Sequence, residues 1–443
     1  MKKTILPILI MVNSLLCSAA VEFSGGSHAV INEKPEASTG LDDIFVVYSA
    51  KGLSMSYTAS SDNVEWYMFS SLGGAYAEKL TGVTRMGNKY TLSKFEGDMG
   101  YYIEDNNRRY YFWVVDYSSH YPHLGSITPS AEQDCDVTNI VFSGSCDRIA
   151  YYTINGQPKT LNREIVLAYN TLEYDSSSMV YNQISTQTKF EYLTENIHTP
   201  APLTDTAFSL SADKYLRQWG EDITIDSPMF QTNAISAQTS AEQEESTHDN
   251  ERHDDSSSLG GSAPAVINFK AVVTDAVAFS EWQFSDDNEF ENITLRMSDL
   301  EFTRTFNEQG TTYIRFFASN AAGTCDYYGD TYEVTIGESI LECPNAFSPG
   351  ATEGINDIWK VSYKSIIDFE CHIFNRWGVE VCSFTDPSQG WDGKYRGKLV
   401  KSGVYFYVIN AKGSDGRVYK LKGDINIINY KPTGTNSGET DTE

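Results

Sequence analysis

The chain has 443 residues, a formal net charge of −27, 13% aromatic residues and 21% charged residues. This length corresponds to about three domains, and the composition excludes a disordered or coiled-coil protein. The acidic surplus excludes a general nucleic-acid binder, because such affinity depends on neutralisation of phosphates by Lys and Arg.

Residues 1–20 predict a secretory signal peptide. Lys2 and Lys3 precede an apolar run that ends at Leu16, and small residues suited to a signal peptidase follow. The run is too short to cross a bilayer as a stable helix, and no later stretch is long enough to be a transmembrane segment. An acylated Cys17 is an alternative, although Leu16 fits poorly before such a cysteine. We therefore expect an exported chain.

The rest of the chain predicts strands and turns. Runs of β-branched and aromatic residues, such as 44–48, 64–69 and 110–115, alternate with Gly-, Asn-, Asp- and Ser-containing turns. No long segment has a 3.6-residue period. The pattern predicts an all-β protein made of serial immunoglobulin-like β-sandwich domains. The expected parts are a signal peptide (1–20), sandwiches at 41–130, 131–237, 264–339 and 341–430, an acidic segment (238–262) and a polar tail (431–443).

The acidic segment at 238–262 differs in composition from its surroundings. It holds seven acidic residues and one arginine, and Leu259 is its single large apolar residue. Such a segment buries too little apolar surface to offset the entropy lost on ordering. We expect a flexible linker or a long loop.

The third predicted sandwich carries a partial family pattern. It reads Trp-Gln-Phe-Ser-Asp at 282–286, Phe-Asn-Glu-Gln-Gly-Thr-Thr-Tyr at 306–313 and Ser-Asn-Ala-Ala-Gly at 319–323. This unit resembles the PKD-like domain, an immunoglobulin-type spacer or adhesion module. The Gly-Asp-Gly of that family is replaced by Ser285, Asp286 and Asp287. The two aspartates are weak calcium candidates, and their alternative role is to form a turn. We expect no cofactor.

The fourth unit carries an ordered set of motifs. They are Pro-Asn-Ala-Phe-Ser-Pro-Gly at 344–350, Gly-Ile-Asn-Asp-Ile-Trp at 354–359, Ile-Phe-Asn-Arg-Trp-Gly at 373–378, Gly-Trp-Asp-Gly-Lys at 390–394, Ser-Gly-Val-Tyr-Phe-Tyr at 402–407 and Leu-Lys-Gly-Asp-Ile at 421–425. This set resembles the gliding motility-associated C-terminal domain, the type B sorting domain of type IX secretion cargo in Bacteroidota. The resemblance implies a C-terminal β-sandwich that directs or anchors the protein, with the type IX export machinery as partner.

The charge of this unit supports a separate recognition element. Residues 343–431 hold twelve basic and nine acidic residues, which gives this unit a net charge of +3. Because the whole chain has a net charge of −27, the remaining residues together carry −30. Lys394, Arg396, Lys398 and Lys401 cluster around one loop. They are candidates for recognition by the export machinery, and the alternative is a solvated rim.

One disulfide is predicted from hairpin geometry. If Arg376 and Trp377 form a two-residue hairpin loop, Cys371 faces Cys382 on the neighbouring strand. Directly opposed residues of an antiparallel pair lie close enough for a disulfide.

A second candidate disulfide joins Cys135 and Cys146, which would close a short loop. Cys325 and Cys343 are expected to be free. The alternative is that all six cysteines after the signal peptide are buried free thiols.

Catalytic motifs are absent from the sequence. It contains no Gly-x-Ser-x-Gly elbow, phosphate loop or His-Glu-x-x-His motif. His120 and His123 have the spacing of metal ligands but lie in a Pro-containing loop without an identifiable third ligand, and His372 alternates with apolar residues on a strand. We expect no enzyme and no metal site.

These observations together predict a non-enzymatic adhesion or structural passenger with a C-terminal sorting domain. We expect it at the cell surface or outside the cell, reached through the periplasm, with a surface glycan or protein as ligand and no nucleic acid. The alternative is a glycan-binding accessory protein that uses exposed aromatics such as Trp66, Tyr67 or Trp219. A secreted hydrolase is a third reading, which requires a pocket with a perturbed acid or histidine.

Overall fold

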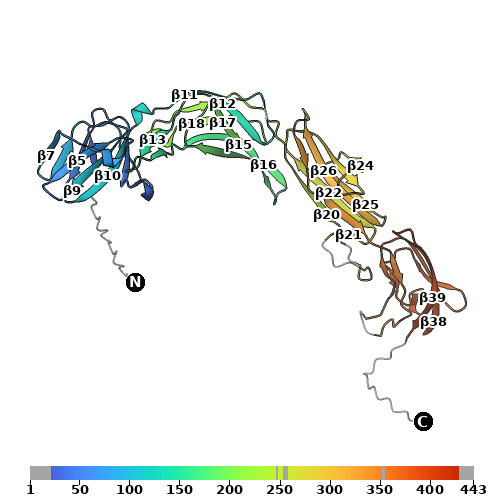
Figure 1. Cartoon of the computed structure of the whole chain (residues 1–443). Helices are drawn as coiled ribbons and strands as arrows, with labels where there is room; N and C mark the ends of the chain where they lie inside the picture. Colours follow the sequence, from blue (N-terminus) through green and yellow to red (C-terminus); the bar gives the residue numbers. More distant parts are fainter. Residues whose placement is uncertain (1–20, 133, 246–247, 253–257, 352–354, 429–443) are drawn as a thin grey trace, which may run out of the picture. The chain divides into compact units, whose positions relative to one another are not determined.

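The computed structural model describes residues 21–428, apart from 133, 246–247, 253–257 and 352–354. The predicted signal peptide and the polar tail therefore lie outside the described residues. The chain divides into two compact units, Met1–Thr171 with Gln183–Thr232, and Leu172–Asn182 with Asn233–Glu443. Mainly antiparallel sheets make up four successive sandwiches (Figure 1), which confirms the prediction of an all-β protein with serial sandwiches.

The helices of the described residues are short. They are α1 (Lys214–Trp219) and the 3-10 helices η1 (Ala37–Thr39), η2 (Gly74–Tyr76) and η3 (Tyr117–Ser119).

The first domain pairs a four-stranded with a six-stranded sheet. The first sheet has the order β1 (Glu22–Ser24), β4 (Ser54–Thr58), β8 (Lys89–Leu92) and β7 (Val83–Met86). The second has the order β2 (Ile31–Glu33), β3 (Asp43–Val47), β10 (Arg108–Asp116), β9 (Met99–Asp105), β5 (Val64–Phe69) and β6 (Glu78–Lys79). Strands β1 and β2 precede residue 41, so this domain begins earlier than expected.

The centre of the six-stranded sheet is buried on both faces. Successive strand residues point to opposite sides, so Phe112 and Val114 of β10 face the sandwich core while Trp113 and Val115 face away from it. Trp113 and Val115 pack with residues of the second domain, including Ile149. The continuous apolar run of β10 therefore serves two cores.

The second domain has two main sheets and a small hairpin. The sheets have the orders β11 (His123–Pro129), β12 (Val137–Ser145), β17 (Asn196–Pro200), and β16 (Val180–Phe190), β15 (Ile165–Asp175), β18 (Ser209–Ser211), β19 (Thr224–Asp226). The hairpin joins β13 (Ile149–Tyr152) to β14 (Pro158–Leu161). Phe142, Leu167 and Phe208 are among the side chains that fill the core.

A buried ion pair lies where the first two domains meet. Arg163 and Asp213 are both fully buried, and Arg163 Nη2 lies 2.6 Å from Asp213 Oδ2. Tyr117 of η3 donates its hydroxyl to Asp213 Oδ1 at 2.8 Å, and the Leu216 backbone N–H donates to the same oxygen at 3.2 Å. Asp213 is thus the N-cap of α1 as well as the counter-ion. Burial raises the pKa of Tyr117, and the neighbouring Asp213 adds to this effect.

The third domain again pairs two sheets. One has the order β20 (Ala237–Gln243), β22 (Ala265–Val273), β25 (Glu301–Phe306). The other has the order β21 (Leu259–Gly261), β28 (Tyr332–Ile336), β26 (Gly310–Asn320), β23 (Val277–Ser285), β24 (Ile293–Met297), with β27 (Asp326–Tyr328) also paired to β26. Trp282, Phe284 and Phe316 lie in the core, as the inward alternation of Trp282 and Phe284 predicted.

The expected linker or long loop at 238–262 is wrong at its two ends, which form strands, whereas the described residues between β20 and β21 lie outside the strands. Strand β20 pairs with β22 over seven positions, and β21 pairs in parallel with β28. Small residues explain the error at β20, because Ala237 and Ala241 contribute to the core while Glu242, the one acidic residue of the strand, is exposed. A polar edge strand needs only small inward residues, so its composition resembles that of a linker.

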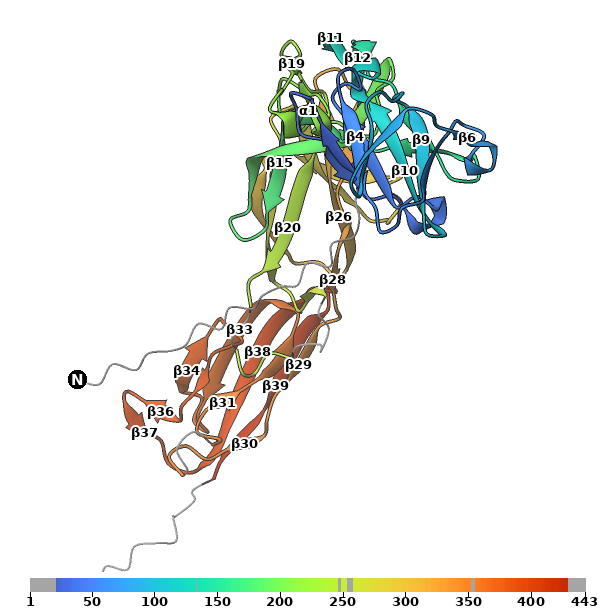
Figure 2. The same cartoon turned by 90° about the vertical axis from the view of Figure 1, so that its left-hand side faces the viewer.

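The fourth domain is built on a five-stranded sheet. Its order is β30 (Ala346–Phe347), β39 (Val418–Ile427), β38 (Gly403–Gly413), β33 (Ile366–Phe374), β34 (Glu380–Phe384). Three two-stranded pairs complete it, namely β29 (Ile340–Glu342) with β32 (Ser362–Lys364), β31 (Trp359–Lys360) with β35 (Gly390–Trp391), and β36 (Lys394–Tyr395) with β37 (Lys398–Leu399). Figure 2 shows β33, β38 and β39 side by side.

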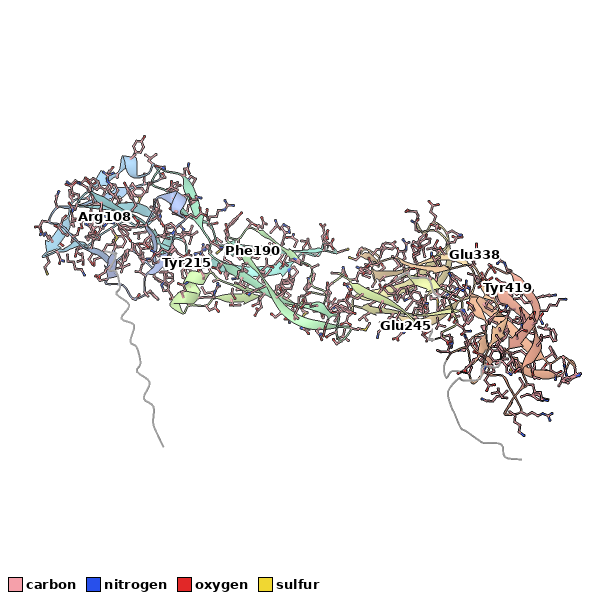
Figure 3. The ribbon with its side chains drawn as sticks, turned by 90° about the horizontal axis from the view of Figure 1, so that it is seen from below. Arg108, Phe190, Tyr215, Glu245, Glu338 and Tyr419 are labelled. Atoms are coloured by element: carbon pink, nitrogen blue, oxygen red, sulfur yellow. The ribbon has the colours of Figure 1, made fainter. Side chains whose placement is uncertain are left out.

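Polar contacts join the third and fourth domains within the second unit. Ser339 Oγ donates to Asp415 Oδ1 at 2.7 Å, and Tyr419 (labelled in Figure 3) donates to the Ser339 carbonyl at 2.9 Å. The acidic segment takes part, since Asn250 Nδ2 donates at 2.8 Å to the carbonyl of Val361. The segment expected to lie between the second and third domains therefore also contacts the fourth.

We expect Asp213→Ala to destabilise the first unit strongly, because it leaves Arg163 buried without its counter-ion and removes the cap of α1. Loss of one partner of a buried pair typically costs about 3–5 kcal/mol. Urea unfolding of the purified chain would measure the change. Asp62→Ala is a matched control, since Asp62 is 89% exposed in its pair with Arg85 and its loss should cost less than about 1 kcal/mol. Equal effects of the two substitutions would contradict a role for the buried pair.

Candidate functional site

The motif tryptophans of the fourth domain form its core. Trp359 and Trp391 lie opposite each other on β31 and β35, and both are buried. The Trp359 Nε1 donates to the Pro344 carbonyl at 2.7 Å, and the Trp391 Nε1 donates to the Lys394 carbonyl at 3.0 Å. Because both rings are packed in the core, neither is available to a ligand.

Trp377 lies in the hairpin loop between β33 and β34 and is not part of the core. Its side chain is 73% exposed, and the Arg376 guanidinium lies 4.2 Å from the ring centroid. The hairpin loop that carries it has three residues, because the Asn375 N–H donates to the Val379 carbonyl and Gly378 adopts a φ of +79°. Such a loop, with glycine in the left-handed region, is a common hairpin connection.

The predicted disulfide between Cys371 and Cys382 is wrong. The three-residue loop and a bulge beyond it shift the pairing, so Cys371 lies opposite Phe384 and Cys382 lies opposite Ile373. Diagonal neighbours are too far apart for a disulfide. Both cysteines are free thiols, and burial raises the pKa of Cys371.

The second predicted pair is also wrong. Cys135 precedes β12 and Cys146 follows it, so a nine-residue extended strand of about 30 Å separates them. Cys135 and Cys325 are each disulfide-bonded, whereas Cys146 and Cys343 are free. The expectation of a free thiol thus holds for Cys343 and fails for Cys325.

The four basic residues of the recognition loop lie on or beside one small hairpin. Lys394 and Lys398 belong to β36 and β37, with Arg396 in the turn between them and Lys401 just beyond. Lys394 Nζ lies 2.7 Å from Asp392 Oδ2, while Arg396 adopts a φ of +50°. Figure 2 shows the hairpin at the side of the five-stranded sheet, next to β34. The structure thus brings the four predicted cations together.

The carboxylate of the calcium candidate Asp287 accepts hydrogen bonds from within its own turn. Asp287 accepts hydrogen bonds from Ser285 Oγ at 2.9 Å and from the Glu291 and Asn292 backbone N–H groups at 3.1 and 3.2 Å. The backbone hydrogen bond from Glu291 is the main cause that lowers the pKa of Asp287. Its carboxylate organises the turn, the alternative that the sequence also allowed, and Asp286 is simply its neighbour in that turn.

The candidate histidines remain apart. His120 Nε2 lies 2.9 Å from Asp98 Oδ1, and His123 is exposed beside Tyr121. The hydrogen bond with Glu380 raises the pKa of His372. Within the described ranges, no group of three His, Cys, Asp or Glu residues is arranged to hold a metal ion.

The aromatic residues expected to be exposed do not form a sugar platform. Trp66 is buried, Tyr67 is stacked on Tyr102 with ring centroids 4.5 Å apart, and Trp219 donates its Nε1 to the Ala29 carbonyl. Sequence reasoning missed Phe279 and Tyr328, which are 53% and 56% exposed on the third domain. The available signal was the alternation of side chains along a strand, which places the neighbours of inward-facing residues on the outer face of the sheet.

An acidic pocket of about 460 Å³ lies between the third and fourth domains, inside the second unit. Its lining includes Glu244, Glu245, His248, Glu251, Asp368 and Asp386. The concentration of carboxylates disfavours anionic ligands.

Comparison with known families identifies two of the four domains. Residues 341–427 match the CHU_C Type IX secretion signal domain, and residues 127–227 match the Fibronectin type III domain. The chain therefore carries a type IX secretion signal domain preceded by an immunoglobulin-like domain, which confirms the resemblance found in the fourth domain. A secretion signal of this kind implies recognition by the type IX machinery and export. Both families are typically non-catalytic folds.

Comparison with whole chains adds little. No curated protein matches the sequence. A tetra-tandem repeat from the extending region of a large adhesion protein is 13% identical, with 86% of this chain and 97% of that chain covered and a TM-score of 0.22. Dimeric latent PorU from Porphyromonas gingivalis is 9% identical, with coverages of 86% and 43% and a TM-score of 0.16. These scores carry no argument about function. None of the helices in the described part of the chain is long and apolar enough to cross a membrane.

We expect four reactive thiols in the mature chain after unfolding without reductant. Cys146, Cys343, Cys371 and Cys382 should be alkylated, because none of them is disulfide-bonded, and mass spectrometry would identify the labelled peptides. Reduction before labelling should add the two cysteines at 135 and 325. Protection of Cys371 and Cys382 without reductant would contradict the observed hairpin register.

Proposed function

We propose that the protein is a non-enzymatic adhesion or structural element of the cell surface. Its fourth domain serves as the type IX sorting or anchoring signal, and the preceding three sandwiches form the passenger. The observation that carries this proposal is the match of 341–427 to a secretion signal domain that follows further β-sandwich domains.

The joints between domains support a structural passenger. Tyr215 (labelled in Figure 3) lies with Tyr117 and Trp113 in one core formed by the first two domains. A buried core between domains resists bending more than a polar linker does. Such a unit suits a protein that presents or spaces a surface, and it requires no catalytic cleft.

A second candidate function is glycan binding, which the notable exposure of two aromatic side chains on the third domain favours. The residues first expected to do this, Trp66, Tyr67 and Trp219, are packed in other contacts. The two exposed rings, Phe279 and Tyr328, therefore offer a different surface for a glycan.

Deletion of the fourth domain should retain the passenger inside the cell. We expect protease added to intact cells to cleave the full chain, whereas a chain truncated before Cys343 should be protected and accumulate in the periplasm. Immunoblotting of cell fractions measures both. Equal surface cleavage of the two chains would contradict a sorting role for this domain.

We propose that the basic hairpin contacts the export machinery. Replacement of Arg396, Lys398 and Lys401 by Gln should reduce surface delivery at least severalfold, since short-range charge pairing would be lost. The matched control replaces Lys412, Lys420 and Lys422, which are exposed on β38 and β39 of the same domain. An equal loss in both triple variants would contradict a specific role for the hairpin and indicate dependence on net charge.

A further inference from the structure

Three aromatic rings line the outer face of the larger sheet of the third domain. Phe317 of β26 lies opposite Tyr328 of β27, with ring centroids 5.0 Å apart. Phe279 of β23 lies on the other side of Phe317, at 6.1 Å. Phe279 and Tyr328 are more than half exposed and Phe317 is partly exposed. These three residues are called the aromatic row below.

Arg315 lies beside the aromatic row, two residues before Phe317 on the same strand. Its guanidinium carbon is 4.0 Å from the centroid of Phe290 and 4.8 Å from that of Tyr328. Its Nε donates to Gln283 Oε1 at 2.9 Å. Guanidinium has five N–H donors, and no other hydrogen bond of Arg315 occurs among the described residues. The terminal amino groups are thus held in place by two rings and remain available to a ligand.

The backbone beneath Arg315 is strained. Phe290 has a φ of +57° and a buried side chain, a conformation that is unfavourable for a bulky residue. The turn bonded to Asp287 holds the loop in this form. Strained residues persist where the surroundings fix them, often at binding sites. Here the strain places a ring against the guanidinium of Arg315.

The polar groups under the face are already organised. Gln283 and Glu281 are 5% and 7% exposed, and Gln283 Nε2 donates to Glu281 Oε1 at 2.7 Å. Arg296 forms an ion pair with the same Glu281 oxygen. A satisfied network of this kind fixes the positions of its members, so Arg315 needs little further ordering when a ligand binds.

We propose that this face of the third domain binds a neutral polysaccharide. The aromatic row would stack on the apolar faces of the sugar rings, and Arg315 would donate to their hydroxyl oxygens. Asp326, which is exposed opposite Ser319 on the same face, supplies an acceptor for hydroxyl protons. Hydroxyls both donate and accept hydrogen bonds, so they match a surface that offers both kinds of group.

Charge and size favour this ligand over others. The adjacent turn carries Asp286, Asp287, Glu289 and Glu291, and the chain has a net charge of −27, so a polyanion would be repelled. A fully buried aromatic side chain contributes about 150–250 Å², and the partly exposed row therefore offers roughly 300 Å². A stable protein interface needs about 800 Å² from each partner, so the aromatic row is too small for a protein partner and fits a short stretch of sugar rings.

A neutral polysaccharide would be the ligand of the proposed cell-surface protein. Binding by the purified chain does not require the proposed surface location, which only explains where the ligand would be met. Affinity electrophoresis of the purified mature chain would test it, with a soluble β-glucan, xylan and galactomannan as neutral probes and polygalacturonate and alginate as acidic ones. We expect at least one neutral polysaccharide to retard the protein, and the acidic ones to retard it less.

The variants Tyr328→Ala and Arg315→Gln should each weaken retardation at least tenfold. Tyr76→Ala should leave it unchanged, because Tyr76 is 71% exposed on the first domain. Thermal unfolding checks that every variant is folded. If Arg315→Gln does not fold, Phe279→Ala replaces it in the test. The proposal is overturned if no neutral polysaccharide binds, if acidic ones bind better, or if retardation survives in folded Tyr328→Ala. The purified chain needs no export, so failure here is distinguishable from failure of the sorting role.

Discussion

The buried ion pair of Arg163 and Asp213 is the interaction on which the first unit depends. A charge removed from water needs a partner of opposite charge and satisfied hydrogen bonds. Asp213 meets this need from the second domain, and Tyr117 reaches it from the first. The pair lies with a core to which both domains contribute. The same carboxylate caps α1, so the local helix and the domain joint share one constraint.

The second unit joins its domains by a different kind of contact. Its joint is rich in hydrogen bonds from serine, asparagine and tyrosine side chains to backbone carbonyls, such as those of Tyr419 and Asn250. Part of the joint comes from the acidic segment, where Asp249 Oδ1 lies 2.6 Å from Lys360 Nζ. Opposite charges on the passenger and the sorting domain therefore meet at short distance, which fits the contrast in net charge between these parts of the chain.

The outer sheet faces differ in what covers them. In the first domain, the far side of β10 is covered by the second domain, so Trp113 and Val115 belong to a core. In the third domain, the row of Phe279, Phe317 and Tyr328 stays open, and a polar network lies beneath it. An uncovered aromatic face beside a rigid arginine is a feature of recognition surfaces. This difference is the reason why the ligand surface is proposed on the third domain.

The sequence by itself determined the all-β class, the inward alternation of Trp282 and Phe284, and the identity of the fourth domain. Strand period and glycine-marked turns are local properties, and ordered motifs do not depend on long-range pairing. Tertiary structure alone decided the register of Cys371 and Cys382, because one extra loop residue and a bulge change every cross-strand neighbour. It also decided which aromatic side chains are covered, since burial depends on the domain that packs against each sheet face. The pairing of the two ends of the acidic segment with β22 and β28 likewise depends on strands that are distant in the sequence.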